Sequence, residues 1–265
     1  MAQNNTNTIR VGILGSTGRV GSLLIEDVQS TEGVELSVVH TNKQIKAQLP
    51  QNIIITNDIE ELIKSADVII DFSAPKATEE LLEATINSNS PKALVIATTG
   101  FTKHQENLLN EASKVAPVLY ASNMSLGVAV LNKLVSLASK ALRDFDIEIV
   151  EMHHKHKVDS PSGTALTLSQ SAAEARDLNI DDVRISGRDG QIGARTKDEI
   201  SVMALRGGDI VGRHTVGFYN DGEFIELNHT ATSRHTFSKG AIKASKWIVN
   251  QENGMYSIND CLGLN

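Results

Sequence analysis

The sequence lacks the features that mark secreted, disulfide-bonded or membrane-inserted proteins. Cys261 is the single cysteine in 265 residues, so no disulfide can form within the chain and a reducing compartment is the natural setting. The polar N-terminal segment has no apolar stretch of the kind found in signal peptides, and no run of about 18 apolar residues predicts a membrane-spanning helix. We therefore expect a cytoplasmic protein with no membrane partner.

Positive charge is also scarce. Lysine and arginine together number 25 against 32 aspartates and glutamates, which gives a formal net charge of -7. Phosphate binding normally needs a basic face, so this composition argues against nucleic acid as the main partner. The hydrophobic content of 40% and the length are typical of a globular protein with one large domain or two smaller ones. In an acidic chain of this kind, a local basic segment is informative.

Residues 151–164 form such a segment. Five of its side chains are basic or titratable near neutral pH: His153, His154, Lys155, His156 and Lys157. Residues 146–152 alternate in the manner of a strand, and Ala165, Leu168 and Ala172 recur at helical spacing after the segment. The segment is therefore predicted to connect a strand to a helix, which is a common location for catalytic groups.

The end of this segment has the features of a helix start that binds anions. Ser160 is predicted to be the N-cap, and Pro161 suits the first helical position. Ser162, Gly163 and Thr164 would then present N–H groups at the positive end of the helix dipole, where a carboxylate or phosphate is favoured. A solvated surface loop and a zinc site remain alternatives, but no cysteine or second carboxylate stands at ligand spacing nearby, so no metal is expected.

The N-terminal part of the chain predicts a dinucleotide-binding site. Residues 9–14 read as a buried strand, and a glycine-rich turn and an apolar helical pattern follow directly. Gly15, Gly18 and Gly21 permit a tight turn and leave N–H groups at a helix start, where they can face a pyrophosphate. A glycine pattern alone is weak evidence, and its position between the first strand and a helix is what supports the prediction.

Further strands are predicted at residues 34–40, 67–72, 93–98 and 118–121, with helical stretches after most of them. This alternation indicates a doubly wound parallel sheet, in which ligands bind at the carboxyl ends of the strands. Polar residues follow three of these strands: Asp71–Pro75, Thr98–Phe101 and Ser122–Ser125. Each of these segments, taken alone, would more simply be an ordinary helix cap.

The second half of the chain changes character after a long helical stretch, residues 126–142. Strands are predicted at 199–205, 210–219 and 223–232, and the turns Gly207–Asp209 and Asn220–Gly222 between them indicate hairpins in a mixed or antiparallel sheet. The predicted fold is α/β, with a Rossmann-type doubly wound parallel sheet and a smaller α+β domain. We assign residues 1–125 to a dinucleotide-binding domain, to which residues 239–265 return, and 126–238 to a domain for substrate binding and oligomerisation.

These motifs resemble the 4-hydroxy-tetrahydrodipicolinate reductases, also called dihydrodipicolinate reductases. The segments that carry the resemblance span nearly the whole chain: Gly15–Gly21, Asp71–Ser73, Thr98–Phe101, Asn123–Ser125, Glu151–Thr164, Gly208–Gly212 and Thr232–Arg234. The resemblance implies hydride transfer from NADPH or NADH to a cyclic unsaturated dicarboxylate, with loss of water, in lysine and diaminopimelate biosynthesis. It also implies a homotetramer built through the sheet of the second domain.

The resemblance also implies roles for individual residues. His153 would be the catalytic proton donor or acceptor, and Lys157 a second donor that also holds the substrate. The other substrate-binding residues would be His154, Ser162, Gly163, Thr164 and Thr99. The cofactor-binding residues would be Gly15, Ser16, Thr17, Gly18, Arg19, Val20, Thr41, Asn42, Ala97, Thr98, Thr99, Ser122, Asn123, Met124 and Ser125.

The choice of cofactor and two other functions stay open at this point. No acidic residue follows the second strand to bind a ribose hydroxyl, and Lys43 stands where it can meet a 2′-phosphate, which favours NADPH over NADH. Another two-domain NAD(P)-dependent dehydrogenase would commonly carry Glu-Lys-Pro where this chain has Thr98–Phe101. A non-catalytic dinucleotide-sensing regulator would have little reason to keep both His153 and Lys157.

Overall fold

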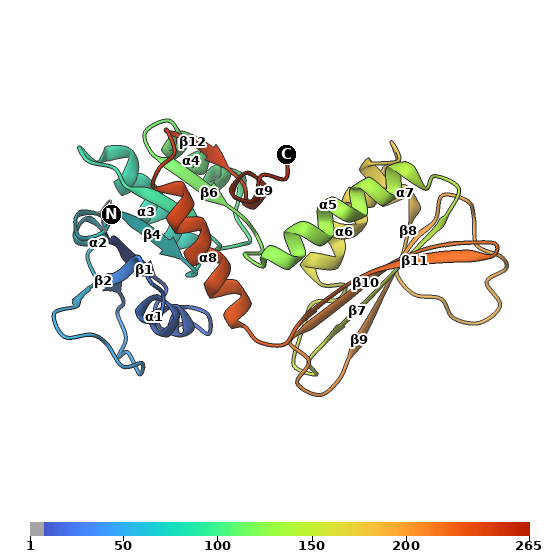
Figure 1. Cartoon of the computed structure of the whole chain (residues 1–265), viewed down its shortest axis with the longest axis horizontal. Coiled ribbons are helices and arrows are strands. Elements are labelled where there is room, and N and C mark those ends of the chain that lie inside the picture. The colour runs from blue at the N-terminus through green and yellow to red at the C-terminus, as the bar shows by residue number, and fades with distance from the viewer. Residues whose placement is uncertain (1–7) are drawn as a thin grey trace, which may run out of the picture. The chain divides into compact units, whose positions relative to one another are not determined.

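The structure, a computed structural model, describes residues 8–265 and divides into two compact units (Figure 1). The first unit runs to Leu126 and resumes at Arg234–Asn265, and the second unit comprises Gly127–Ser233. Residues 1–7, which hold most of the polar segment for which no signal peptide is predicted, lie outside the described range. Within that range no helix has the length and apolar character needed to cross a bilayer.

A parallel sheet forms the centre of the first unit. Its strands are β1 (Ile9–Leu14), β2 (Val34–His40), β3 (Ile54–Thr56), β4 (Val68–Asp71), β5 (Ala93–Ile96), β6 (Pro117–Tyr120) and β12 (Gly254–Tyr256). Within the described residues the strand order is β12-β6-β5-β4-β1-β2-β3, and every pairing is parallel. The predicted doubly wound parallel sheet is confirmed. The three-residue strands β3 and β12 were not predicted, because three residues are too few for a recognisable pattern.

Helices cover both faces of this sheet. They are α1 (Gly21–Gln29), α2 (Ile59–Ser65), α3 (Pro75–Asn87), α4 (Lys103–Ser113), α8 (His235–Ile248) and α9 (Ile258–Leu262). Leucines of α2, α3 and α4 share one hydrophobic cluster with the sheet, while α1 packs against α8, which lies along β4, β5 and β6. Every residue of β4 and β5 is buried. Successive side chains of a strand point to opposite faces, so both faces must be covered.

A mixed sheet forms the centre of the second unit. Its strands are β7 (Asp146–His153), β8 (Arg184–Ile185), β9 (Ile200–Arg206), β10 (Gly212–Asn220) and β11 (Glu223–Ala231), and its helices are α5 (Leu126–Ala141), α6 (Gly163–Glu174) and α7 (Ile180–Val183). Strand β7 runs parallel to β9 and antiparallel to β10, so the sheet is mixed. One of the two predicted hairpins is correct, because β10 pairs with β11 across Asn220 and Glu223.

The hairpin predicted at Gly207–Asp209 is wrong. The strands that this turn connects, β9 and β10, are not neighbours, because β7 lies between them in the order β11-β10-β7-β9-β8. Turn residues report only the local change of chain direction. They cannot show that a strand formed some fifty residues earlier enters between the two arms.

The two faces of this sheet differ. Alternate residues of β7, among them Ile147 and Ile149, pack with residues of α5 and α6 in one hydrophobic cluster. We call the opposite side of the sheet the open face. It carries the ion pair of Glu148 with Arg188. It also carries the rings of Tyr219 and Phe224, whose centroids lie 5.6 Å apart. By the same alternation, Glu151 lies on the helix-covered face and His153 follows at the end of the strand.

Candidate active site

A buried carboxylate, Glu151, lies at the centre of the candidate site. Its side chain is fully buried and accepts four hydrogen bonds. The donors are His153 Nδ1 at 2.6 Å, the Ser162 backbone N–H at 2.9 Å and two nitrogens of Arg206 at 2.9 Å each. Burial alone raises the pKa of Glu151, but the bonds from Arg206, His153 and Ser162 together hold its pKa below the usual value. Glu151 is therefore ionised at neutral pH.

The register of the sheet brings these groups together. Arg206 on β9 is the partner of His153, and His214 on β10 is the partner of Glu151. Arg206 also donates to the backbone carbonyl of Asp159 at 2.7 Å, so it connects β9 to the loop before α6. We call Glu151, His153, Ser162, Arg206 and His214 the Glu151 cluster.

His153 is held so that one ring nitrogen stays available. Its Nδ1 bonds to Glu151, and its side chain is 12% exposed. The ring lies edge-on to that of His214, with the ring centroids 5.2 Å apart. A Cβ atom at Gly212 would lie 3.1 Å from Nε2, so only a glycine leaves this side of the ring uncrowded. Since Nδ1 is occupied by a carboxylate, Nε2 is the nitrogen that can exchange a proton with a ligand.

His214 is a neutral neighbour of His153. It is only 4% exposed, and its Nε2 lies 3.1 Å from Ser162 Oγ. Burial, followed by the charge of His153, lowers the pKa of His214 to about 4. His214 thus carries no charge at neutral pH and supports the packing of the cluster.

The start of α6 differs from the sequence prediction. Ser162, not Ser160, is the N-cap, because its Oγ accepts the Ala165 N–H at 3.2 Å, and Pro161 precedes the helix. The Ser162 N–H is bonded to Glu151 and its side chain is buried, so the prediction that it presents a free donor is wrong. At Gly163, by contrast, an added Cβ would meet no described atom within 4 Å. A ligand can therefore approach the backbone at Gly163.

The other predicted substrate-binding groups of this unit lie on the same loop and helix start. Lys157 Nζ donates to both carboxylate oxygens of Asp159 at 2.8 Å, and this bond is the main cause of the lowered pKa of Asp159. The Lys157 N–H donates to the His154 carbonyl, and the His154 ring lies beside His156. Thr164 follows Gly163 in the first turn of α6. His154 and Lys157 thus lie on the loop before α6, and Thr164 lies in its first turn.

The predicted cofactor-binding segments lie at one edge of the parallel sheet. Leu14, Asp71, Ile96 and Tyr120 are aligned across β1, β4, β5 and β6, and each ends its strand. Residues 15–20, 97–99 and 122–125 follow three of these strand ends, and Thr41 and Asn42 follow β2, the other neighbour of β1. This is the edge at which parallel doubly wound sheets bind nucleotides.

The glycine turn fits a pyrophosphate. Gly15 has φ +86°, and a Cβ there would lie 2.6 Å from the Phe72 carbonyl oxygen. A Cβ at Gly21 would lie 2.1 Å from the Gly15 carbonyl oxygen, so both positions require glycine. Helix α1 begins here with no side-chain cap on its N–H groups, as α3 and α8 do, whereas α2, α4 and α6 are capped by Asp58, Thr102 and Ser162. An uncapped helix start next to a glycine turn provides donors for phosphate oxygens.

Some predicted cofactor-binding residues offer only their backbone. Asp71 is fully buried and accepts bonds from Ser73, Thr78 and Thr98; burial is the main cause of its raised pKa. The Thr98 hydroxyl is thus already hydrogen-bonded within the protein. The Ser16 hydroxyl is engaged in the same way, because it donates to the His40 carbonyl at 3.0 Å. The Met124 side chain is fully buried as well. The side chains of Ser16, Thr98 and Met124 therefore stabilise this edge of the sheet.

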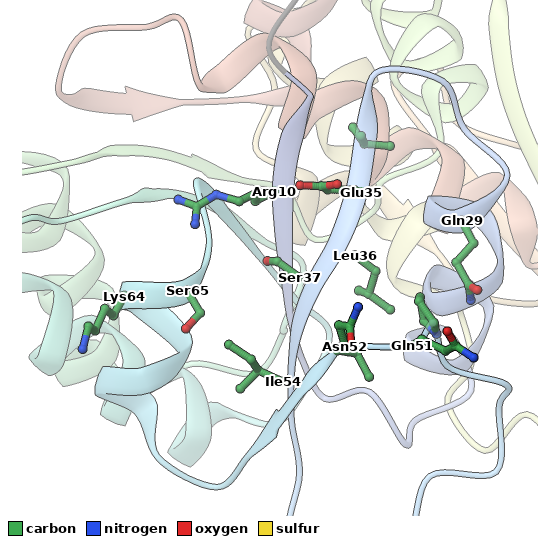
Figure 2. A pocket seen from close by; sticks show the side chains of 13 residues that line it. Arg10, Gln29, Glu35, Leu36, Ser37, Gln51, Asn52, Ile54, Lys64 and Ser65 are labelled. Carbon is green, nitrogen blue, oxygen red and sulfur yellow. The ribbon is translucent and has the colours of Figure 1, made fainter.

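Two hollows lie beside the parallel sheet. The smaller, of about 460 Å³, is lined by Thr41, Asn42, Lys43 and Thr56 at the carboxyl ends of β2 and β3. The larger, of about 770 Å³, lies at the amino ends of β1 and β2, where Figure 2 shows Arg10 and Glu35. Ligands of such sheets bind at the carboxyl ends, and Arg10 already pairs with Asp67 at 2.7 Å. The smaller hollow lies at that end of the sheet and is lined by the predicted cofactor-binding residues Thr41 and Asn42.

Arg206, His214 and the central role of Glu151 escaped the sequence analysis. Arg206 and His214 lie on β9 and β10, about fifty residues from the histidine segment, and only strand pairing brings them to it. One signal was present for His214: it occupies an inward position of an alternating strand, where a histidine needs a partner.

Metal ligands were not expected in the histidine segment. Within residues 8–265, a group of three possible ligands with atoms within 4.8 Å of one another consists of Glu79, Glu83 and His104. These residues lie on α3 and α4 of the first unit, and their side chains are at least partly exposed. They are not part of the Glu151 cluster.

Comparison with known proteins identifies the family. The family models for the N-terminus and the C-terminus of dihydrodipicolinate reductase match residues 9–124 and 127–262. The 4-hydroxy-tetrahydrodipicolinate reductase of Aliarcobacter butzleri (strain RM4018) is 71% identical over 256 residues, which cover 97% of this chain and 100% of that protein. The protein of that name from Sulfurovum sp. (strain NBC37-1) is 66% identical and covers 96% of this chain and 99% of its own.

A solved structure supports the same family assignment. The dipicolinate-bound dihydrodipicolinate reductase from Paenisporosarcina sp. TG-14 superposes with a TM-score of 0.77 at 25% identity, covering 94% of this chain and 97% of that one. The matches extend over both units, including the glycine turn and the segment from Glu151 to Thr164. This chain therefore belongs to the dihydrodipicolinate reductase family.

Proposed function

We propose that this protein reduces 4-hydroxy-tetrahydrodipicolinate to tetrahydrodipicolinate with NADPH or NADH, as a step of lysine and diaminopimelate biosynthesis. The observation that carries the proposal is the Glu151 cluster: a histidine with one nitrogen fixed by a buried carboxylate, next to a helix start with an open glycine. Relatives at 71% and 66% identity carry the name of this activity. The substrate is an acid, and the cluster supplies both a proton and donors for a carboxylate.

The first unit would bind the cofactor, which supplies the hydride. The glycine turn and the uncapped start of α1 bind the pyrophosphate through backbone N–H groups. Thr41 and Asn42 hold the adenosine ribose, and the backbone at Thr98 and Thr99 lines the nicotinamide end. Lys43 is exposed in the hollow at the end of β2 and binds a 2′-phosphate, so NADPH is preferred.

The second unit would bind the substrate and supply the proton. Loss of the 4-hydroxyl group as water extends the conjugated system of the substrate, and hydride that then reaches one carbon leaves negative charge elsewhere in that system. His153 donates a proton from Nε2 to neutralise that charge, while Nδ1 stays bonded to Glu151. Lys157 acts as a second donor. A substrate carboxylate lies against Gly163 and Thr164, with His154 and Lys157 beside it.

A coupled assay tests the activity. The unstable substrate is generated from pyruvate and aspartate semialdehyde by the synthase, and the absorbance of NADPH and of NADH is followed in separate reactions. We expect oxidation of the cofactor only when the substrate is being formed. If neither cofactor is oxidised, the proposed function is wrong.

The cofactor preference has its own test. Lys43→Glu removes the positive charge that would meet a 2′-phosphate, so we expect the ratio of kcat/KM for NADPH to that for NADH to fall by about tenfold or more. Lys46→Glu, an exposed lysine on the same loop, is the control. An unchanged ratio in Lys43→Glu would exclude this lysine from cofactor recognition.

We further propose a cytoplasmic homo-oligomer, with a tetramer implied by the family resemblance. The supporting observation is strand β11, a nine-residue edge strand on which Phe224 is 66% exposed and Ile225 is 45% exposed. A long edge strand with exposed apolar side chains is usually covered by another subunit or element. The open face beside it provides the surface for that contact.

A further inference from the structure

Two members of the Glu151 cluster, Glu151 itself and Arg206, transfer no proton in the chemistry proposed above. We propose that they are positioning residues, which fix the ring orientation and the proton distribution of His153 and align the start of α6 with it. This inference rests on the proposed function of His153 as the proton donor. It extends that function to a fully buried carboxylate and to the arginine that pairs with it.

The hydrogen bonds are divided evenly between the two oxygens of Glu151. Oε1 accepts the Ser162 N–H and one nitrogen of Arg206, and Oε2 accepts His153 Nδ1 and the other nitrogen of Arg206. A buried carboxylate without a cation would bind a protonated imidazole very strongly. Arg206 offsets that negative charge with a bidentate contact, so Glu151 orients the ring of His153 without retaining the proton on Nε2.

The same carboxylate connects the proton donor to the anion-binding backbone. Ser162, whose N–H it accepts, immediately precedes Gly163 in the chain. Arg206 also donates to the Asp159 carbonyl, and the Asp159 side chain accepts the bonds of Lys157. Through these contacts one buried group sets the relative positions of His153, Lys157 and the first turn of α6.

A glutamine in place of Glu151 would reverse the proton arrangement. If the amide NH₂ took the place of Oε1, it would face two donors, the Ser162 N–H and Arg206. It is therefore expected to take the place of Oε2, where it faces Arg206 and His153 Nδ1. His153 can accept this bond only as the neutral ring with its proton on Nε2, because the protonated ring has no acceptor nitrogen. The proton-donating form of His153 is thereby disfavoured.

Steady-state kinetics of the full-length protein test this role. We expect Glu151→Gln to lower kcat by about a hundredfold or more, with the KM for the substrate changed by no more than about threefold. Binding of NADPH should be unchanged. The matched control is Glu148→Gln, which removes a carboxylate that lies on the same strand, faces the open side and pairs with Arg188. It should keep the wild-type kcat, provided that its elution volume in size-exclusion chromatography is that of the wild type.

Nitrogen-15 NMR of histidine-labelled protein supplies a readout that a purely structural role would not change. In the wild type, Nδ1 of His153 should carry a proton, and in Glu151→Gln the proton should be on Nε2 alone. Arg206→Lys keeps the positive charge but loses the bidentate contact, so an intermediate kcat is expected, and this variant serves if Glu151→Gln does not fold. If Glu151→Gln keeps the wild-type ring protonation and the kcat of the Glu148→Gln control, the positioning role is overturned.

The two proposals fail in different ways. A wild-type protein that oxidises neither NADPH nor NADH would overturn the proposed function. The NMR measurement would still decide whether Glu151 orients His153, because it requires no turnover.

Discussion

At the scale of single residues, the site is defined by which of its buried side chains carry a charge. Glu151 has no exposed side-chain surface and remains ionised because four N–H donors surround its carboxylate. His214, equally buried but without a comparable set of partners, is neutral instead. Of two buried titratable side chains on neighbouring strands, one is thus charged and the other neutral, and the difference is set by their hydrogen bonds.

Removing the proposed proton donors should separate catalysis from cofactor binding. His153→Ala and Lys157→Ala are each expected to lower kcat by about a hundredfold to ten-thousandfold, because each removes a group that transfers a proton or holds the substrate. The dissociation constant of NADPH should not change, since the proposed cofactor residues belong to the first unit. His104→Ala, which removes an exposed histidine, is the control. Equal loss of NADPH binding and turnover would argue against these roles.

His214 predicts a specific pH dependence of stability. Its pKa falls from 6.5 in the unfolded chain to about 4 in the folded protein, so the unfolded chain binds more protons between these values. The free energy of unfolding should therefore decrease as the pH falls from 6.5 towards 4, by up to about 3 kcal/mol from this residue.

Urea unfolding at pH 7 and at pH 4.5 measures this effect. His214→Gln can still bond to Ser162 but does not titrate, so it should lose less stability over this range than the wild type does. His104→Gln, an exposed histidine, should behave like the wild type. If His214→Gln and the wild type lose the same free energy, His214 is not the group that titrates.

At the scale of elements, the hydrophobic pattern predicted the long strands and helices well. Residues 9–14 and 34–40 were predicted as strands with the bounds that β1 and β2 have, because β1 is mostly apolar and buried, and the first residues of β2 alternate between apolar and polar. The pattern could not predict strand order in the second unit, since β7 enters between β9 and β10 by pairing that no local residue records. The partners of Glu151 were missed for the same reason, because Arg206 and His214 reach it through that pairing.

The start of α6 shows a second limit of local patterns. Ser160 and Ser162 both satisfy the sequence rule for an N-cap, and Pro161 between them favoured the earlier choice. The Ser162 N–H instead completes the hydrogen bonds of a carboxylate on β7, so tertiary contacts place the helix start two residues later.

Two serine substitutions distinguish these helix starts. Ser162→Ala removes the cap of α6 and the partner of His214 Nε2, so the free energy of unfolding should fall by about 1 to 2 kcal/mol. Ser160→Ala, at an exposed position before the helix, should change it by less than about 0.5 kcal/mol. Urea denaturation of both variants measures the difference. A larger loss in Ser160→Ala would restore Ser160 as the N-cap.

At the scale of the whole molecule, the first unit is discontinuous in sequence. Helix α8 packs on α1, where His235 Nδ1 lies 2.9 Å from a carboxylate oxygen of Asp27, and β12 extends the sheet beside β6. The first unit therefore cannot complete its sheet until the chain has passed through the second unit. Residues 239–265 were assigned to the first domain from the sequence without a pattern that required it, and the first unit contains Arg234–Asn265.

The oligomer proposed for this protein depends on the open face and edge of the second unit. Phe224 is 66% exposed and its ring lies 5.6 Å from that of Tyr219, so it presents apolar surface on β11, the edge strand that pairs with β10. An aspartate at this position would place a charge in a subunit contact, and we expect Phe224→Asp to shift the molar mass measured by light scattering to a smaller species.

Leu137→Asp, which changes an exposed residue of α5, is the control. Because α5 packs on the opposite face of the sheet, this control should keep the wild-type mass. A wild-type protein that is monomeric at all concentrations would refute the oligomer, and an unchanged mass in Phe224→Asp would exclude this edge as the contact.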